Sequence, residues 1–231
     1  MKKDEYVIIT ASSKGLGKAL ALVFADNGYN IILNGRNKDK IQETKKDLDN
    51  KGVDVIVIKG DIRDEEVLNN FYNVALDRKT TILINSAAIP CSGKPLDKIT
   101  DEDIEENVGI NLIAQLKLTR RIYNIFLKHG GGTIININSI VGIEPKEFRS
   151  IHSSSKWGFK GFSQSLRIEA KKNNIRVMSI YPTRIKTSSE FEYGMEPIDV
   201  AKKIFDAYMN NKDDEIIIDG RPPEFRPGYK G

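Results

Sequence analysis

The feature that most constrains the fold of this chain is a regular alternation of short apolar runs with longer segments of helical spacing. Short runs rich in valine and isoleucine are typical of strands that are buried on both faces. Because parallel strands need a helical crossover between them, the alternation predicts a doubly wound α/β fold, a parallel sheet with helices on both faces. The predicted strands are Tyr6–Thr10, Asn30–Leu33, Val53–Lys59, Thr81–Asn85, Thr133–Asn138, Arg176–Tyr181 and Glu215–Ile218. The predicted helices are Gly15–Asn27, Lys38–Asn50, Glu65–Arg78, Asp101–Lys128, Ser153–Asn173 and Ile198–Asn210.

Length and charge favour one domain with a small-molecule ligand. Single α/β domains commonly reach this length, so residues 1–231 are expected to form a single domain. Residues 221–231 contain three prolines and two glycines and are predicted to be a coil-like C-terminal tail. The 36 basic and 32 acidic residues are interspersed along the chain, which disfavours a nucleic-acid partner.

The few cysteine and histidine residues argue against a disulfide-bonded or metal-binding protein. Cys91 is the single cysteine and cannot form an internal disulfide, and it forms no cluster of metal-ligand spacing with the two histidines, so no metal is expected. The apolar run that follows the charged N-terminal residues is too short for a signal peptide or a membrane span. We therefore expect a cytoplasmic protein with no membrane partner.

The first predicted strand leads into a glycine-containing turn and then directly into an apolar helix. Gly15 and Gly17 allow the backbone to approach a pyrophosphate, and the free amides of the helix start supply donors. The spacing differs from the three-glycine dinucleotide fingerprint, and an ordinary turn is the alternative interpretation. The segment comprises Thr10, Ala11, Ser12, Ser13, Lys14, Gly15, Leu16 and Gly17.

Together with segments further along the chain, this turn resembles the short-chain dehydrogenase/reductase family from about Tyr6 to Gly220, with Ala11 at the first glycine of the family pattern. The resemblance implies a single-domain Rossmann-type fold that binds a nicotinamide dinucleotide. It implies that Asp61 contacts the adenine, that the turn at residues 85–88 stabilises the sheet, and that residues 180–187 hold the nicotinamide. The expected cofactor-binding residues are Thr10, Ser12, Ser13, Lys14, Gly15, Leu16, Gly17, Arg36, Asp61, Ile62, Asn85, Ser86, Ala87, Lys156, Pro182, Thr183, Ile185 and Thr187.

The same resemblance places three catalytic residues at Asn111, Ser139 and Lys156. It implies that Ser139 hydrogen-bonds the substrate carbonyl, that Asn111 holds a water in a proton relay, and that Lys156 binds the nicotinamide ribose. Lys156 is predicted to open its helix, where its charge opposes the helix dipole and so favours a specific role. The alternative interpretations are that Ser139 is an ordinary turn residue, that the Asn111 amide caps a neighbouring carbonyl, and that Lys156 is a solvated surface lysine.

The family signature Tyr-x-x-x-Lys is altered in this chain, where His152 stands four residues before Lys156. A phenol titrates near pH 10, whereas an imidazolium titrates near about 6.5 and lower beside a lysine ammonium. A neutral imidazole N–H could still polarise a carbonyl. Three interpretations remain open: a working but altered acid, a protein that has lost turnover, and a replacement of a natural tyrosine.

The end of the second predicted strand indicates the cofactor. Arg36 stands where an NAD enzyme of this kind carries a carboxylate, and no acid is expected to oppose a 2′-phosphate there. Arg36 and Lys14 can bind a 2′-phosphate, and the resemblance also associates a basic residue at position 14 with NADP. Solvated surface cations are the alternative. The sequence therefore predicts NADP(H) as the cofactor.

These observations predict an NADP(H)-dependent reductase of a ketone or aldehyde, or a dehydrogenase of the corresponding alcohol, in which Ser139 and His152 stabilise the developing alkoxide. The alternative is a nucleotide-binding regulator or scaffold with little or no turnover. By resemblance, the helices that carry Asn111, Trp157, Phe159 and Phe162 would form a homodimer or homotetramer. The segment between Thr187 and Pro197 is expected to be a short substrate lid, with Phe191, Tyr193 and Met195 lining the substrate pocket.

Overall fold

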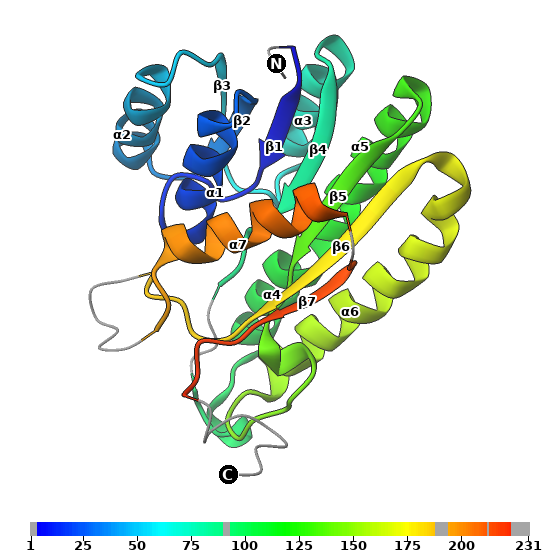
Figure 1. The fold of residues 1–231 in the computed structure, drawn as a ribbon. Coiled ribbons are helices and arrows are strands. Elements are labelled where there is room, and N and C mark those ends of the chain that lie inside the picture. The colour runs from blue at the N-terminus through cyan, green and yellow to red at the C-terminus, as the bar shows by residue number, and fades with distance from the viewer. Residues whose placement is uncertain (1–3, 90–92, 188–193, 212, 223–231) are drawn as a thin grey trace.

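A computed structural model describes residues 4–89, 93–187, 194–211 and 213–222. Seven parallel strands form one sheet in the order β3-β2-β1-β4-β5-β6-β7, which confirms the predicted doubly wound sheet (Figure 1). The Rossmann-type strand order places its topological switch point between β1 and β4. The strands are β1 (Tyr6–Ile9), β2 (Asn30–Gly35), β3 (Val55–Lys59), β4 (Thr80–Asn85), β5 (Gly132–Ile137), β6 (Ile175–Pro182) and β7 (Glu215–Ile218).

Helices cover both faces of the sheet. One hydrophobic cluster joins a sheet face to α1, α2 and α7, and a second cluster joins the opposite face to α3, α5 and α6 (Figure 1). The α-helices are α1 (Gly15–Asp26), α2 (Lys38–Asp49), α3 (Glu65–Asp77), α4 (Asp101–Val108), α5 (Ala114–His129), α6 (Ser150–Ala170) and α7 (Pro197–Asn210). Shorter helical turns are η1 (Leu96–Lys98), η2 (Gly109–Ile113), η3 (Ile140–Gly142) and η4 (Lys171–Asn173).

The central strand β1 shows why the apolar runs are continuous rather than alternating. Val7 and Ile9 pack into the cluster of α1 and α7, whereas Ile8 packs into the cluster of α3 and α5. All three side chains are fully buried, because successive strand residues point to opposite faces and both faces are covered. Each such side chain contributes about 1.5–3 kcal/mol of hydrophobic stabilisation.

The predicted helix Asp101–Lys128 is interrupted, which corrects the expectation of one continuous helix. Helix α4 starts with a capping box between Thr100 and Asp103 and ends at Val108. The π-helical turn η2 follows, and α5 begins only at Ala114. Asn111 lies in η2, where its buried amide bonds the backbone of the neighbouring loop rather than facing solvent. A π-helical turn at a buried polar residue is frequently a functional feature.

Helix α6 begins at Ser150, three residues earlier than the predicted Ser153. Lys156 therefore lies inside the helix, and the expectation that it opens the helix against the dipole is wrong. Gly130 ends α5 in a left-handed conformation with φ 81°, as the glycine run after that helix indicates. Among the described residues, none of the helices has the length and apolar character needed to cross a membrane.

Candidate cofactor and active site

A cavity of about 350 Å³ opens at the carboxyl edge of the sheet, where β1, β2, β3 and β4 end. It includes the switch point between β1 and β4, which is where open α/β sheets bind their ligands. Its lining residues are Ala11, Ser13, Lys14, Asn34, Gly35, Arg36, Asn37, Lys40, Gly60, Asp61, Ile62, Ala87, Ala88, Ile89 and Ile110.

The glycine turn between β1 and α1 is tightly constrained. Ala11 has a φ of 51° and Gly15 a φ of 54°, both in the left-handed region that favours glycine. A Cβ atom at Gly17 would lie only 2.3 Å from the Ala11 carbonyl oxygen, so only glycine fits there. Ala11 stands at the first glycine of the pattern that this turn resembles, and its positive φ is one that glycine adopts without strain.

Hydrogen bonds fix the residues around this turn. Thr10 Oγ1 accepts from the backbone N–H groups of Ser86 and Ala87, each at 2.9 Å, which ties the ends of β1 and β4 together. Ser12 Oγ donates to the Ile9 carbonyl at 2.7 Å. Thr10 and Ser12 are fully buried, so their side chains hold the turn in place and do not line the cavity.

Asn34, which the sequence reasoning did not single out, lines the cavity and bonds the backbone around it. Its Oδ1 accepts from the Ala11 N–H at 3.1 Å, and its Nδ2 donates to the Ile58 carbonyl at 2.9 Å and the Gly60 carbonyl at 3.3 Å. The amide is buried and joins the loops after β1 and β3. A polar amide at the end of an apolar strand was the available sequence signal.

Three cations, Lys14, Arg36 and Lys40, line the same cavity, and Lys40 was not predicted. Arg36 Nη1 lies 3.3 Å from Asp61 Oδ2, which corrects the expectation that no acid opposes a phosphate beside this arginine. Arg63 also donates to Asp61, with 3.0 Å between Nη2 and Oδ2. Partial burial opposes ionisation of Asp61, but the Arg63 hydrogen bonds and the Arg36 charge outweigh it and lower the pKa of the carboxyl.

The remaining predicted cofactor residues lie at two places along this edge. Ser13, Lys14, Arg36, Asp61, Ile62 and Ala87 line the cavity. On the β6 side, Thr187 packs against the glycine turn, because a Cβ atom at Gly15 would lie 3.2 Å from Thr187 Cγ2. Thr183 Oγ1 accepts from the Gly220 N–H at 2.9 Å, and Ile185 forms a β-bridge with Met195. The predicted positions Leu16, Asn85 and Pro182 are buried.

Met195 therefore belongs to the packed part of the expected lid, where its side chain also packs against the core. Phe191 and Tyr193 lie outside the described residues, as do Cys91 and the tail from 223 onwards.

The end of β5 is linked to α6 through Asn138. Its Oδ1 accepts from the Ser139 N–H at 2.9 Å, and its Nδ2 donates to the Lys156 carbonyl at 3.1 Å. Ser139 is half-buried, and its hydroxyl oxygen accepts from the Val141 N–H at 3.4 Å. Asn138, a second residue that the sequence reasoning missed, thus holds two predicted catalytic positions in a fixed relation.

Lys156 is buried, with 1% of its surface exposed. Its Nζ donates to the Ile137 carbonyl at 3.3 Å and lies 5.8 Å from the centroid of the Phe159 ring. Burial lowers the pKa of this ammonium to about 8. An ammonium has three hydrogens to donate, and within the described part of the chain the Ile137 carbonyl is the one acceptor bonded to it, which leaves donors for a ligand at the end of β5. The burial of Lys156, and not its position relative to the helix dipole, therefore favours a specific role for this side chain.

His152 lies in the first turn of α6 and contacts Asn111 from η2. The Asn111 Nδ2 atom is 3.3 Å from His152 Nδ1. Burial, with the nearby charges of Lys156 and Arg149, lowers the pKa of the imidazole to about 4. The imidazole is therefore neutral at pH 7.

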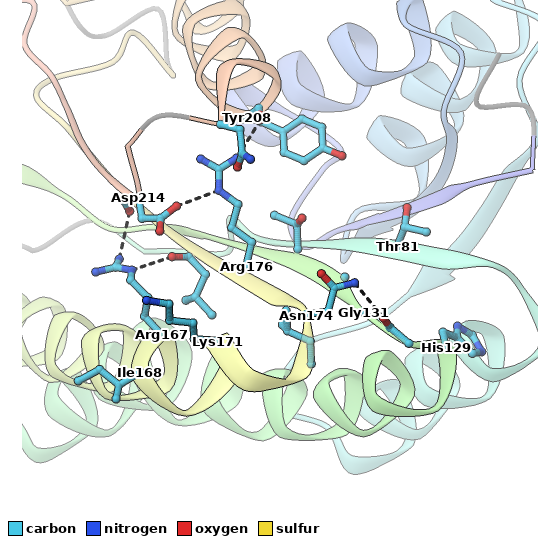
Figure 2. A pocket seen from close by; sticks show the side chains of 16 residues that line it. Thr81, His129, Gly131, Arg167, Ile168, Lys171, Asn174, Arg176, Tyr208 and Asp214 are labelled. Carbon is cyan, nitrogen blue, oxygen red and sulfur yellow. Dashed lines mark hydrogen bonds and ion pairs between the residues drawn. The ribbon is translucent and has the colours of Figure 1, made fainter.

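A larger groove of about 1070 Å³ lies at the opposite, amino edge of the sheet and includes His129 (Figure 2). Arg176 Nε lies 2.8 Å from Asp214 Oδ1, and Arg176 Nη1 donates to the Tyr208 carbonyl at 2.9 Å. Arg167 Nη2 donates to the Asp214 carbonyl at 3.1 Å. Through these bonds Arg176 joins β6 to α7, and Arg176 and Arg167 both bond Asp214, the residue that precedes β7.

The strand order and the carboxyl-edge cavity define the class: a doubly wound α/β protein of the kind that binds dinucleotides at its switch point. The family model for short chain dehydrogenase matches residues 5–194. The chain belongs to the short-chain dehydrogenase family.

Individual relatives and solved structures are similar to this chain at modest identity. The uncharacterized oxidoreductase YxnA of Bacillus subtilis is 29% identical over 190 residues, which cover 80% of this chain but only 53% of YxnA. A short-chain dehydrogenase from Sphingobium yanoikuyae in complex with NADPH is 25% identical with a TM-score of 0.84, covering 93% of this chain and 87% of the other. A bulky-bulky ketone specific alcohol dehydrogenase from Comamonas testosteroni is 25% identical with a TM-score of 0.85, covering 92% and 85%.

Proposed function

We propose that this protein is an NADP(H)-dependent oxidoreductase that reduces a ketone or aldehyde, or oxidises the corresponding alcohol. The observation that carries the proposal is the cavity at the switch point, where three cations gather beside a glycine turn and a helix N-terminus. The NADPH complex of the Sphingobium relative and the ketone specificity of the Comamonas enzyme support the same assignment.

The residues of this chain fit the parts of NADPH. Lys14, Arg36 and Lys40 would hold the 2′-phosphate, because guanidinium and ammonium groups bind phosphate through charge-assisted hydrogen bonds. The amides of the glycine turn would hold the pyrophosphate, and the unused donors of Lys156 would bind ribose hydroxyls. The bound nicotinamide would supply or accept the hydride.

In the reduction, the protein must stabilise negative charge on the substrate oxygen and deliver a proton to it. Ser139 and His152 would donate hydrogen bonds to that oxygen, since preorganised donors are worth most where charge develops in the transition state. Lys156 carries a proton that it can release near neutral pH, because burial lowers its pKa to about 8. Asn111, the fourth predicted catalytic residue, contacts His152.

The lowered pKa of His152, about 4, favours a second candidate function. A neutral imidazole is a poor proton donor compared with the family's tyrosine, so a nucleotide-binding regulator or scaffold with little or no turnover is the alternative.

The discriminating experiment measures NADPH oxidation against a panel of ketones and aldehydes, beside calorimetric titrations with NADPH and NADH. Turnover on a carbonyl with tighter binding of NADPH than of NADH is the expected result. Binding without turnover on any substrate would support the regulator, and absence of binding would refute both candidates.

We also propose a homodimer or homotetramer in the cytoplasm, with light scattering at micromolar concentration as the test of assembly. Trp157 on α6 is 47% exposed and Ile113 in η2 is 49% exposed, so both can contact a second copy. Phe159 is fully buried and Phe162 packs against the core, which corrects the expectation that they face a partner. A monomer would refute the proposal.

A further inference from the structure

The orientation of the Asn111 side chain is determined by the backbone of Ile89. The Ile89 N–H donates to Asn111 Oδ1 at 2.9 Å, and Asn111 Nδ2 donates to the Ile89 carbonyl at 3.2 Å. If the amide were rotated to exchange its two ends, the Ile89 N–H would face an NH₂ group and the carbonyl would face an oxygen. Asn111 is fully buried, so water cannot replace these bonds. The amide nitrogen therefore faces away from the Ile89 N–H.

A second buried side chain holds the same nitrogen. Asn107, one helical turn earlier, accepts from Asn111 Nδ2 at 3.1 Å through its Oδ1 atom. The same oxygen accepts from Ser155 Oγ at 3.0 Å, and Ser155 Oγ also lies 2.9 Å from the His152 carbonyl. Asn107 is 5% exposed and Ser155 is 1% exposed. Hydrogen bonds thus connect Asn107 to His152 by two routes: through Asn111 to the imidazole and through Ser155 to the backbone carbonyl.

The amide nitrogen is the group that meets the imidazole, 3.3 Å from His152 Nδ1. An amide NH₂ has two hydrogens and accepts none, and these two are shared among the Ile89 carbonyl, Asn107 Oδ1 and His152 Nδ1. A proton on Nδ1 would face these hydrogens with no acceptor, so the contact favours an Nδ1 that carries no proton. In a neutral ring the proton then lies on Nε2.

We propose that Asn111 is a positioning residue that holds His152 as the neutral Nε2–H tautomer, so that His152 acts on the substrate oxygen as a hydrogen-bond donor and not as its acid. The catalytic part of this inference rests on the proposed carbonyl reduction, whereas the tautomer itself does not. The charged groups near the ring, Lys156 and Arg149, are both cations and also disfavour a second proton on it.

The proposal assigns the proton of the reduction to a different group. A bound NADPH would supply the hydride and would itself be oxidised to NADP⁺. As the new C–H bond forms at the substrate's carbonyl carbon, the C=O electron pair would move to oxygen, and His152 Nε2–H would stabilise the resulting charge. The oxygen then takes a proton that originates from the Lys156 ammonium, which becomes a neutral amine and is reprotonated from solvent. Stabilisation of the charge and supply of the proton would thereby be divided between His152 and Lys156.

The tautomer can be measured without any substrate by nitrogen-15 NMR of histidine-labelled protein, because protonated and unprotonated ring nitrogens differ strongly in chemical shift. The chain has only two histidines, and His129→Gln assigns the remaining signals to His152. At pH 7 the wild type is expected to show a protonated Nε2 and an unprotonated Nδ1. The opposite assignment, or an imidazolium, would overturn the proposal even if every variant failed to fold.

Two matched variants test whether Asn111 is the cause. Asn111→Asp presents an acceptor to Nδ1, so the proton is expected to appear on Nδ1. Asn107→Asp adds the same charge one turn away, but position 107 already accepts from Asn111, so the Nε2–H tautomer is expected to persist. A protonated Nδ1 in both variants would show an effect of charge alone and overturn the positioning role. Absence of carbonyl turnover with the expected tautomer would instead count against the proposed function.

Discussion

Arg36 and Asp61 follow the neighbouring strands β2 and β3 and form an ion pair, with 3.3 Å between Arg36 Nη1 and Asp61 Oδ2. The arginine side chain is 61% exposed, so the pair contributes little to stability. Its consequence is positional, because it restrains the guanidinium beside the cavity that Lys14 and Lys40 also line. The Arg63 bonds to the same carboxylate leave Asp61 less able to repel a phosphate.

We expect Arg36→Ala to weaken NADPH binding far more than NADH binding. A charge-assisted hydrogen bond contributes about 1.5–3 kcal/mol, which corresponds to roughly a ten- to hundredfold loss in affinity for the phosphorylated cofactor. Lys40→Ala should act in the same direction. Calorimetric titration with both cofactors measures the two dissociation constants.

Lys38→Ala is the matched control for this series. Lys38 begins α2, close to both cations along the chain, but it does not line the cavity. Its loss should leave both affinities nearly unchanged. Equal weakening of NADPH and NADH by Arg36→Ala would contradict the assignment of Arg36 to the 2′-phosphate.

His152→Tyr is expected to raise the rate of carbonyl reduction near neutral pH. The substitution supplies a phenol at the position of the family acid, while Lys156 and Asn111 remain in place to support it. Steady-state kinetics at saturating NADPH, with wild type beside the variant, provide the comparison. A tyrosine variant that binds NADPH but reduces no substrate would mean that more than the acid has been lost, and the regulator would replace the reductase.

The pH profile of reduction by the wild type should be set by Lys156. The pKa of His152 is lowered to about 4, so its titration leaves the range from about pH 6 upward flat. Reduction consumes a proton, and the ammonium form of Lys156 is lost as the pH rises through its pKa of about 8. The rate should therefore fall above about pH 8. A fall centred near or below pH 6.5 would instead identify an imidazolium as the acid.

Lys156→Met should stabilise the fold while it abolishes turnover. The pKa of Lys156 falls from 10.5 in the unfolded chain to about 8 in the folded one, which corresponds to about 3 kcal/mol of cost below pH 8. Between about pH 8 and pH 10.5 the unfolded state binds more protons than the folded state, so the stability of the wild type rises with pH across this range. The methionine variant should therefore be more stable at pH 8, by an amount that shrinks toward pH 10.5.

Urea unfolding at pH 8 and pH 10, with Lys160→Met as control, measures this difference. Lys160 lies on the same helix, over the Trp157 ring, and is only partly buried. A stability gap between the Lys156 variant and wild type that stays constant with pH would refute the lowered pKa.

The sheet and the glycine turn were predictable because their signals are local. A strand buried on both faces needs a short apolar run, as around Ile8, and the turn needs Gly17 because no side chain fits beside the Ala11 carbonyl. The predicted catalytic and cofactor positions come from resemblance, and their roles stay predictions. The interruption at Asn111 escaped prediction because the apolar spacing on either side of it continues with nearly the same period.

The sequence by itself determined the order of the strands and helices, the place of the phosphate turn and the exchange of tyrosine for His152. Only the tertiary structure decided that Arg36 faces Asp61, 25 residues away, that Lys156 is buried, and that Asn111 meets His152 across 41 residues of chain. Hydrophobic periodicity is a property of the local sequence, whereas the protonation of a side chain depends on which distant groups folding places next to it.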